Sequence, residues 1–223
     1  SLRGEEARYH TDIQYRPHGD QARNAYRQVR AEQVRRGERR HVPRRKRAER
    51  EERPVDRLAA RGACFSHTFA QSTVCAPSRA TLMLGQHTGH AWIRGNGEFP
   101  IRPEDVTVAE VLKEAGYATG VVGKWDSGQA RRYLPLQRGF DRFYGFLQGE
   151  TDQFHPELTY DNHPVDPPCG PEEGYHLSED LVDQSMAFIR DSTSIRPDRP
   201  FFLYLAFGAT HSPHQAPREF IEK

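Results

Sequence analysis

The chain of 223 residues has only three cysteines, Cys64, Cys75 and Cys169, and no long apolar run. Three cysteines are too few, and odd in number, for a disulfide framework. A cysteine with a functional role must therefore act through the reactivity of its own thiol. A membrane-spanning helix needs about 20 consecutive apolar residues, and a chain in which 28% of residues are charged supplies no such stretch. No apolar signal region follows Ser1, which leaves the compartment open between cytoplasm and periplasm.

An excess of either charge is also missing, because 32 Lys and Arg balance 31 Asp and Glu to a net charge of +1. This balance excludes a globally basic nucleic-acid-binding protein and an acidic solubilising chain. The average conceals a division near Pro54, since residues 1–53 hold 16 basic and 9 acidic side chains and the rest of the chain holds 16 and 22. The basic run Arg35–Arg53 lacks aromatic residues for base stacking, so nucleic acid is not a favoured partner.

The segment 1–53 is poor in apolar residues, with five Leu, Ile or Val residues in neither strand nor helix periodicity. Such a segment cannot bury enough apolar surface to offset the entropy of ordering it, so we expect it to be largely disordered. An alternative is translation of the wrong reading frame, since 28 Arg against 4 Lys in the chain suggests a GC-rich gene. The predicted organisation is therefore an Arg-rich segment 1–53 followed by one domain, 54–223.

From Pro54 onward, helical and strand patterns alternate. Thr107 and Glu110 form a capping box for one helix, and Ser178 is the expected cap of another. The apolar run 201–207 is typical of a strand covered on both faces. The pattern predicts an α/β fold with a mostly parallel sheet. The expected helices are 55–61, 75–85, 107–115 and 178–190, and the expected strands are 63–69, 117–122 and 201–207.

Ligands of open α/β sheets bind beyond the carboxyl ends of the strands, and four side chains are expected there. Cys75 begins a helix, where free N–H groups favour an anion, and Arg79 lies one turn further on. Lys124 and His211 follow two of the strands. Together they suggest a site for a tetrahedral oxyanion. For each residue a structural role stays open: a small core residue for Cys75, a solvated loop residue for Lys124, and a partner of a loop carbonyl for His211.

The segment Cys75-Ala76-Pro77-Ser78-Arg79, with Leu and Gly a turn or two later, resembles the signature of the type I sulfatases, the formylglycine-dependent arylsulfatase family. Five further blocks are similar to sulfatase sequence and come in the family's order. The resemblance covers about Pro54 to Lys223. These further blocks are Pro54–Gly62, Val108–Thr119 with Gly123-Lys124-Trp125, Arg138–Gly145, Tyr160–Pro168 and Phe201–Pro217.

The resemblance implies an alkaline-phosphatase-like α/β sandwich that hydrolyses small-molecule sulfate esters. In this family the signature cysteine, here Cys75, is oxidised to formylglycine by a formylglycine-generating enzyme. One hydroxyl of the hydrated aldehyde, bound to a divalent cation that is usually calcium, attacks the sulfur, and the second expels the sulfate. By the same resemblance, Arg79 holds the hydrate, Lys124 binds the sulfate oxygens, and His211 contacts the sulfate or the leaving group.

The chain departs from the family pattern in ways that affect the metal site. No Asp-Asp pair occurs in the sequence, although the family's first strand ends in such a pair of metal ligands. The family's Asp-Asn pair and a further lysine lie beyond the His211 block. We therefore expect an incomplete fold and a polypeptide that is inactive alone. Asp126 stands where the family has a sulfate-binding histidine, and an aspartate there repels sulfate unless it is paired or binds metal.

Two alternative functions remain open at this stage. One is a phosphonate or phosphate ester hydrolase of the same fold, which uses the same aldehyde. The other is a non-catalytic relative that keeps only the anion pocket.

Overall fold

A computed structural model describes residues 54–97, 99–212 and 214–222. All of them belong to the second of the two units of the chain, Val42–Lys223. The expectations for segment 1–53, disorder or a wrong reading frame, therefore lie outside the described residues. None of the described helices is both long and apolar enough to cross a membrane.

A mixed five-stranded sheet forms the centre of the described unit, in the order β4-β3-β2-β1-β5. Strand β1 (Ala118–Lys124) is parallel to both of its neighbours, β2 (Arg142–Phe146) and β5 (Phe201–Ala206). Strands β3 (Leu158–Tyr160) and β4 (His163–Val165) extend the sheet in antiparallel fashion. The α/β class is confirmed, and the parallel part of the sheet consists of β1, β2 and β5.

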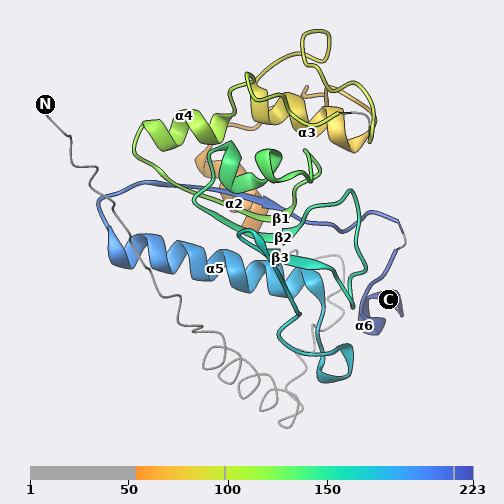
Figure 1. Cartoon of the computed structure of the whole chain (residues 1–223). Coiled ribbons are helices and arrows are strands. Elements are labelled where there is room, and N and C mark those ends of the chain that lie inside the picture. Colours follow the sequence, from red (N-terminus) through yellow and green to blue (C-terminus); the bar gives the residue numbers. More distant parts are fainter. Residues whose placement is uncertain (1–53, 98, 213, 223) are drawn as a thin grey trace, which may run out of the picture. The chain divides into compact units, whose positions relative to one another are not determined.

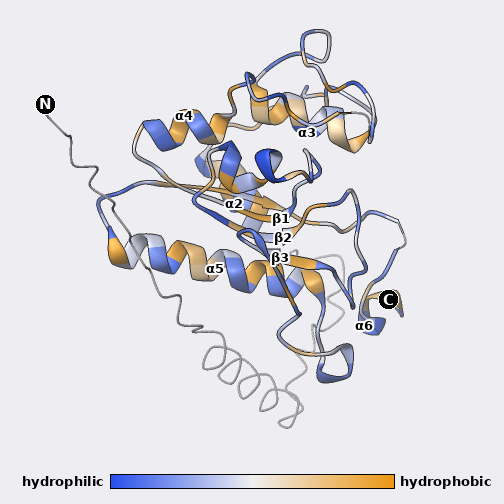
Figure 2. Cartoon of the chain, in the orientation of Figure 1, coloured by the Kyte–Doolittle hydropathy of each residue, from blue (hydrophilic) through white to orange (hydrophobic). Residues whose placement is uncertain are grey.

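Helices cover both faces of this sheet (Figure 1). α5 (Leu177–Ile195) lies on one face, and α3 (Cys75–Leu84) and α4 (Val108–Glu114) lie on the other. Apolar residues run along the central strands, whereas polar residues line the outer sides of the helices (Figure 2). The remaining helical segments are short: α2 (Pro54–Arg61), α6 (Arg218–Ile221), η1 (Arg131–Tyr133), η2 (Pro135–Arg138) and η3 (Pro171–Glu173).

A hydrophobic core cluster lies between the sheet and the α3–α4 side. It includes Val121 of β1 and Phe143 of β2, and Trp125 packs edge-on against Phe140 with ring centroids 5.9 Å apart. The indole N–H of Trp125 donates to the carbonyl oxygens of Gly128 (3.1 Å) and Tyr133 (3.0 Å). This packing fixes the chain directly after β1, where candidate site residues lie.

The cap of α4 is the one expected from the sequence. The Thr107 hydroxyl accepts from the Glu110 amide (3.2 Å), and the Glu110 carboxylate accepts from the Thr107 amide (2.7 Å). The Thr107 hydroxyl also donates to the Arg138 carbonyl oxygen (2.9 Å). Gly116 follows the helix with a φ of 92°, as expected for a residue that ends it.

Two expectations for the strands are wrong. Residues 63–69 form no strand, and Phe65 and Phe69 are about four-fifths exposed, at 79% and 80%. The sequence alternates as in a strand, but no strand of the described sheet pairs with this segment. Strand β5 forms as expected, yet it is not covered on both faces. It lies at the edge of the described sheet, and Phe201 and Leu205 are exposed.

Helix α5 also differs from its prediction. Its N-cap is His176, not Ser178: the His176 Nδ1 accepts from the Ser178 amide (3.3 Å). Leu181 of this helix is buried, but Val182 and Met186 are exposed. An imidazole can cap a helix with the lone pair of its ring nitrogen, and the usual cap preferences do not include it.

Two glycines at the carboxyl ends of the parallel strands allow close backbone contact. Gly123 of β1 pairs in register with Gly145 of β2, and their φ values are 110° and 151°. A Cβ atom at Gly145 would lie 2.0 Å from the Gly123 carbonyl oxygen. One at Gly123 would lie 2.0 Å from the Ala206 carbonyl oxygen. Any side chain at either position would push the three strands apart where the site residues begin.

Asp180 near the start of α5 is a buried carboxyl group, only 1% exposed. It accepts from the hydroxyl groups of Tyr144 (2.6 Å) and Tyr175 (3.0 Å). Loss of hydration raises the pKa of Asp180, and the tyrosine hydrogen bonds only partly offset this. The folded state therefore holds this proton to a higher pH than the unfolded state does.

We predict that Asp180 makes the free energy of unfolding fall as pH rises through the window between the ordinary and the raised pKa. In that window the folded state binds more protons than the unfolded state, which gives a negative slope. Asp180→Asn should remove this slope, and the exposed control Asp198→Asn should keep it. Urea denaturation at a series of pH values measures both. Parallel curves for Asp180→Asn and the unmodified chain would contradict the prediction.

Candidate functional site

The carboxyl ends of β1, β2 and β5 lie at one edge of the sheet. Lys124, the last residue of β1, pairs with Phe146, and Gly123 pairs with Ala206 of β5. The last residue of β1, the loops that follow β1 and β5, and the first two turns of α3 carry every residue expected at the site. We call this set, Cys75, Arg79, Lys124, Asp126 and His211, the candidate anion site.

Cys75 is the first residue of α3 and is half-buried. The N-cap residue, Val74, provides no side-chain hydrogen bond to the helix. The Ala76 amide instead donates to the Asn96 Oδ1 (3.0 Å). Asn96 was not expected at the site, because nothing in the sequence links it to a helix that begins 20 residues earlier in the chain.

Arg79 joins α3 to the end of β1. Its Nε donates to the Trp125 carbonyl oxygen (3.2 Å) and its Nη2 donates to the Lys124 carbonyl oxygen. The guanidinium also lies over the ring of Tyr204 in β5, 5.4 Å from the centroid. Burial raises the pKa of the Tyr204 hydroxyl, and the positive charge of Arg79 opposes this shift. One side chain thus fastens the helix of Cys75 to two of the parallel strands.

Lys124 is buried at 5% exposure and lies beside Asp126. Its Nζ is 3.3 Å from the Asp126 Oδ2, and the two side chains are 6% and 17% exposed. This carboxylate oxygen is buried and makes no hydrogen bond of good geometry among the described residues. Asp126 is therefore paired with a cation, which is one of the two conditions under which an aspartate is compatible with a neighbouring anion.

His211 lies in the loop after β5 and is more exposed. Its Nδ1 is 2.6 Å from the Ser212 carbonyl oxygen and 3.2 Å from the Glu150 Oε2. The described contacts do not join His211 directly to Cys75, Arg79 or Lys124. The structure thus links Arg79, Lys124 and Asp126 through contacts, carries Cys75 on the same helix as Arg79, and places His211 on a loop at the same edge of the sheet.

Gln215 holds the loop of His211 in place and was missed from the sequence. Its side-chain amide donates to the Asp152 Oδ2 (2.6 Å), and its Oε1 accepts from the Gln153 amide (2.8 Å). Its carbonyl oxygen lies 3.3 Å from the His176 Nε2. The hydrogen bond from Gln215 holds the pKa of Asp152 below its ordinary value, helped by the amides of Phe154 and His155. No sequence pattern marks such contacts.

A calcium site does not fit the described residues. No three His, Cys, Asp or Glu side chains gather closely enough there to hold a metal ion. The Asp-Asn pair at 161–162 does not supply one either, because Asp161 accepts from Arg142 Nη1 and from the Phe143 amide, both at 3.0 Å. Asp161 therefore holds the turn between β3 and β4 against β2.

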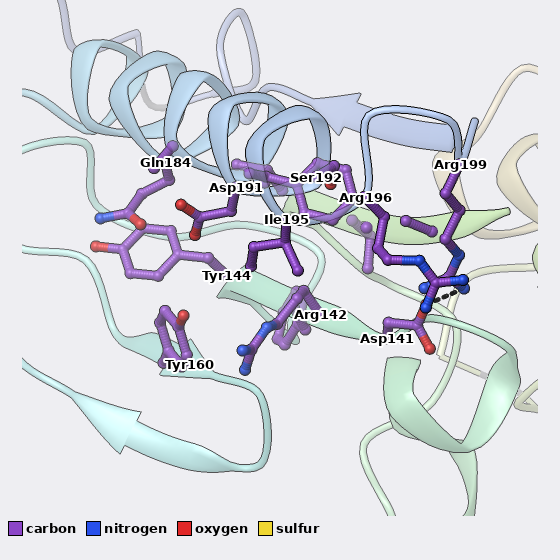
Figure 3. A pocket seen from close by; sticks show the side chains of 17 residues that line it. Asp141, Arg142, Tyr144, Tyr160, Gln184, Asp191, Ser192, Ile195, Arg196 and Arg199 are labelled. Atoms are coloured by element: carbon purple, nitrogen blue, oxygen red, sulfur yellow. Dashed lines mark ion pairs between the residues drawn. The ribbon is translucent and has the colours of Figure 1, made fainter. Parts of the chain in front are cut away.

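A cavity of about 260 Å³ lies elsewhere, between α5 and strands β1 and β2 (Figure 3). Two of the arginines that line it, Arg142 and Arg199, have partners within the chain. Arg199 pairs with Asp141 at 3.5 Å and donates to the Gly116 and Tyr117 carbonyl oxygens, and Arg142 pairs with Asp161 at 3.0 Å. Because these groups hold the chain together, and α3 lies on the other face of the sheet, we do not place the site here.

The family model described as "Sulfatase" matches residues 32–223. The chain belongs to the sulfatase family. This confirms the resemblance carried by the Cys75 segment. The match begins before Pro54, and residues 32–53 lie outside the described part of the structure, so the predicted domain boundary stays a prediction.

Known sulfatases are similar over about three quarters of the chain. Human arylsulfatase A is 34% identical over 197 residues, covering 76% of this chain and 38% of its own length. The pig N-acetylgalactosamine-6-sulfatase is 30% identical over 194 residues, covering 75% and 36%. The crystal structure of Ps i-CgsB superposes with a TM-score of 0.59 at 26% identity, covering 69% of this chain and 38% of that one. The chain thus spans little more than a third of the length of these relatives.

Proposed function

We propose that this chain is the part of a sulfuric ester hydrolase, of the arylsulfatase type, that carries the nucleophile and the anion-binding side chains. The observation that supports this most is the contact of Arg79 with the carbonyl oxygens of Lys124 and Trp125. It fastens the helix that begins at Cys75 to the end of β1, where an anion would meet the buried ammonium of Lys124.

In this proposal Cys75 acts after oxidation to formylglycine by a formylglycine-generating enzyme. The hydrated aldehyde has two hydroxyl groups on one carbon. Oxygen of the first gives up its proton and forms a bond to sulfur while the bond from sulfur to the ester oxygen breaks, and the leaving oxygen takes up a proton and departs as the alcohol. The second hydroxyl then loses its proton, the carbon–oxygen bond to sulfate breaks, and the aldehyde returns as sulfate departs. A serine would remain as a stable sulfate ester, which is the chemical reason for the aldehyde.

The other residues bind charge and move a proton. Lys124 has one described contact at its ammonium group, with Asp126, so N–H bonds remain for the non-bridging oxygens of the ester. His211, held by Glu150 and the Ser212 carbonyl oxygen, gives a proton to the leaving oxygen. Arg79 keeps the first turn of α3, and with it residue 75, against the end of β1.

The chain alone is expected to release little sulfate. A metal ion acting as a Lewis acid supplies several kcal/mol of transition-state stabilisation, and the described residues form no metal site. The substrate class is a sulfate ester of an aryl or sugar alcohol, as the names of arylsulfatase A and N-acetylgalactosamine-6-sulfatase suggest.

Formylglycine formation tests this proposal without depending on turnover. We predict that co-expression with a formylglycine-generating enzyme converts Cys75 to formylglycine, detected by mass spectrometry of the peptide that contains it. Cys64 and Cys169, in the same digest, serve as internal controls and should stay as thiols. An unmodified Cys75 would contradict the proposal and favour the non-catalytic anion-binding alternative.

Measurements of turnover test the remaining alternative, a phosphonate or phosphate ester hydrolase. Comparing aryl sulfate with aryl phosphonate or phosphate, in the longest protein that contains this chain, distinguishes a sulfatase from a phosphonate or phosphate ester hydrolase. Sulfate release at the level of a full-length sulfatase from the 223-residue chain would contradict the expectation that it is inactive alone.

A further inference from the structure

We infer that Asp126 makes the candidate anion site selective for esters with a single negative charge, such as sulfate monoesters, over dianionic phosphate monoesters. This inference rests on the proposed function, since it concerns the same site. It follows from the way in which cations and carboxylates are arranged around the end of β1.

Carboxylates accompany two of the three basic groups of the site. Asp126 lies 3.3 Å from the ammonium of Lys124, and Glu150 lies 3.2 Å from the imidazole of His211. Arg79 has carbonyl oxygens, not a carboxylate, at its guanidinium. The net positive charge that an incoming ester meets is therefore small, and Asp126 is the less exposed of the two carboxylates, at 17% against 63%.

The carboxylate of Asp126 cannot easily turn away from a bound anion. The residue has a φ of 53°, and its amide donates to the Leu147 carbonyl oxygen (3.2 Å). The Oδ1 atom lies close to Gly149, where an added Cβ would be 3.4 Å from it. Contacts on both sides thus fix the negative charge beside Lys124.

A fixed, half-buried charge discriminates between anions by their own charge. Water screens it poorly, so each negative charge on the ester is repelled by Asp126 as well as attracted by Lys124. A sulfate monoester carries one charge and a phosphate monoester carries nearly two above its second pKa of about 6. The repulsion by Asp126 is therefore about twice as large for the phosphate ester, and it offsets the equally doubled attraction by Lys124. The larger cost of taking a doubly charged ester out of water then favours the sulfate ester, without any difference in shape.

The experiment compares phenyl sulfate with phenyl phosphate, two esters of the same shape, in equilibrium binding to the whole 223-residue chain at pH 8. Chemical-shift titration by NMR suits weak ligands. We expect phenyl sulfate to bind about tenfold more tightly, and Asp126→Asn to bring the two dissociation constants close together by strengthening phosphate binding. Asparagine tolerates positive φ as well as aspartate does, so the backbone is retained. Asp166→Asn, an exposed carboxylate after β4, is the matched control and should leave the ratio unchanged.

A second measurement needs no variant. At pH 5 phenyl phosphate is mostly a monoanion, and the ratio of the two dissociation constants for the unmodified chain should approach one. If Asp126→Asn leaves the ratio of the two dissociation constants unchanged, or strengthens the binding of both esters equally, the inference is overturned. The proposed function would still stand. Absence of saturable binding by either ester would instead remove the anion site itself, and the inference with it.

Discussion

Replacing Gly145 with alanine should lower the free energy of unfolding by about 4 kcal/mol or more, a large effect for one methyl group. The added Cβ would lie 2.0 Å from the Gly123 carbonyl oxygen and 2.7 Å from its Cα. Both atoms belong to backbone in the middle of the sheet, so relief requires moving β1 away from β2. Breaking this register also disturbs Lys124, the next residue of β1.

Gly174→Ala is the matched control for Gly145→Ala. Gly174 also has a positive φ, 89°, but nothing lies within 4 Å of an added Cβ there. Gly174→Ala should therefore lower the free energy of unfolding by only about 1–2 kcal/mol, the cost of a side chain in a left-handed backbone conformation. Chemical denaturation of both variants measures the difference. Equal losses would show that backbone conformation, not crowding between strands, requires glycine at position 145.

Removing the ammonium of Lys124 should weaken binding of phenyl sulfate by about tenfold to a hundredfold, the range expected for a hydrogen bond to a charged group. Lys124→Met alone would leave the Asp126 carboxylate half-buried without a counter-ion, which destabilises the fold. The double variant Lys124→Met with Asp126→Asn removes both charges and shortens only the lysine side chain, by one atom. NMR titration with phenyl sulfate measures the loss as the difference between the double variant and Asp126→Asn, which share the missing carboxylate.

Lys113→Met provides the control for Lys124. Lys113 lies on α4 and pairs with Asp141 at 2.8 Å, away from the candidate anion site, with 45% of its side chain exposed. This variant should bind phenyl sulfate as the unmodified chain does. If the double variant also bound it normally, the anion would not be held at the end of β1 and the proposed function would fail.

Elements specified by local sequence were predicted well. The capping box of Thr107 and Glu110 needs only residues within one turn, and α4 begins where it was expected. The helix that begins at Cys75 ends at Leu84, and Gly85 follows with a φ of 61°. In both cases the determining interactions lie within a few residues along the chain, so the sequence contains them directly.

Features that depend on distant partners were predicted poorly. Residues 63–69 alternate like a strand, but a strand also needs a neighbour to take up its hydrogen bonds, and the pattern cannot tell whether one is present. Similarly, Asn96 at the start of α3 and Glu150 beside His211 contribute through contacts across 20 and 61 residues of chain. The sequence marks Lys124 and His211 by their positions at the ends of predicted strands, whereas nothing in it marks Asn96 or Glu150.

Hydrogen bonds of the Gln215 side chain position the loop of His211 independently of the Cys75 segment and Lys124. Through hydrogen bonds to Asp152 and Gln153, the loop after β5 takes its position from a segment that precedes it by about 60 residues. Changes in the 151–155 segment can therefore reorient the imidazole while the Cys75 segment and Lys124 stay as they are. In the proposed function His211 acts on the leaving group, so the tolerance for different leaving groups would diverge separately from the Cys75 segment. The 151–155 segment is then where an attempt to retarget the protein should begin.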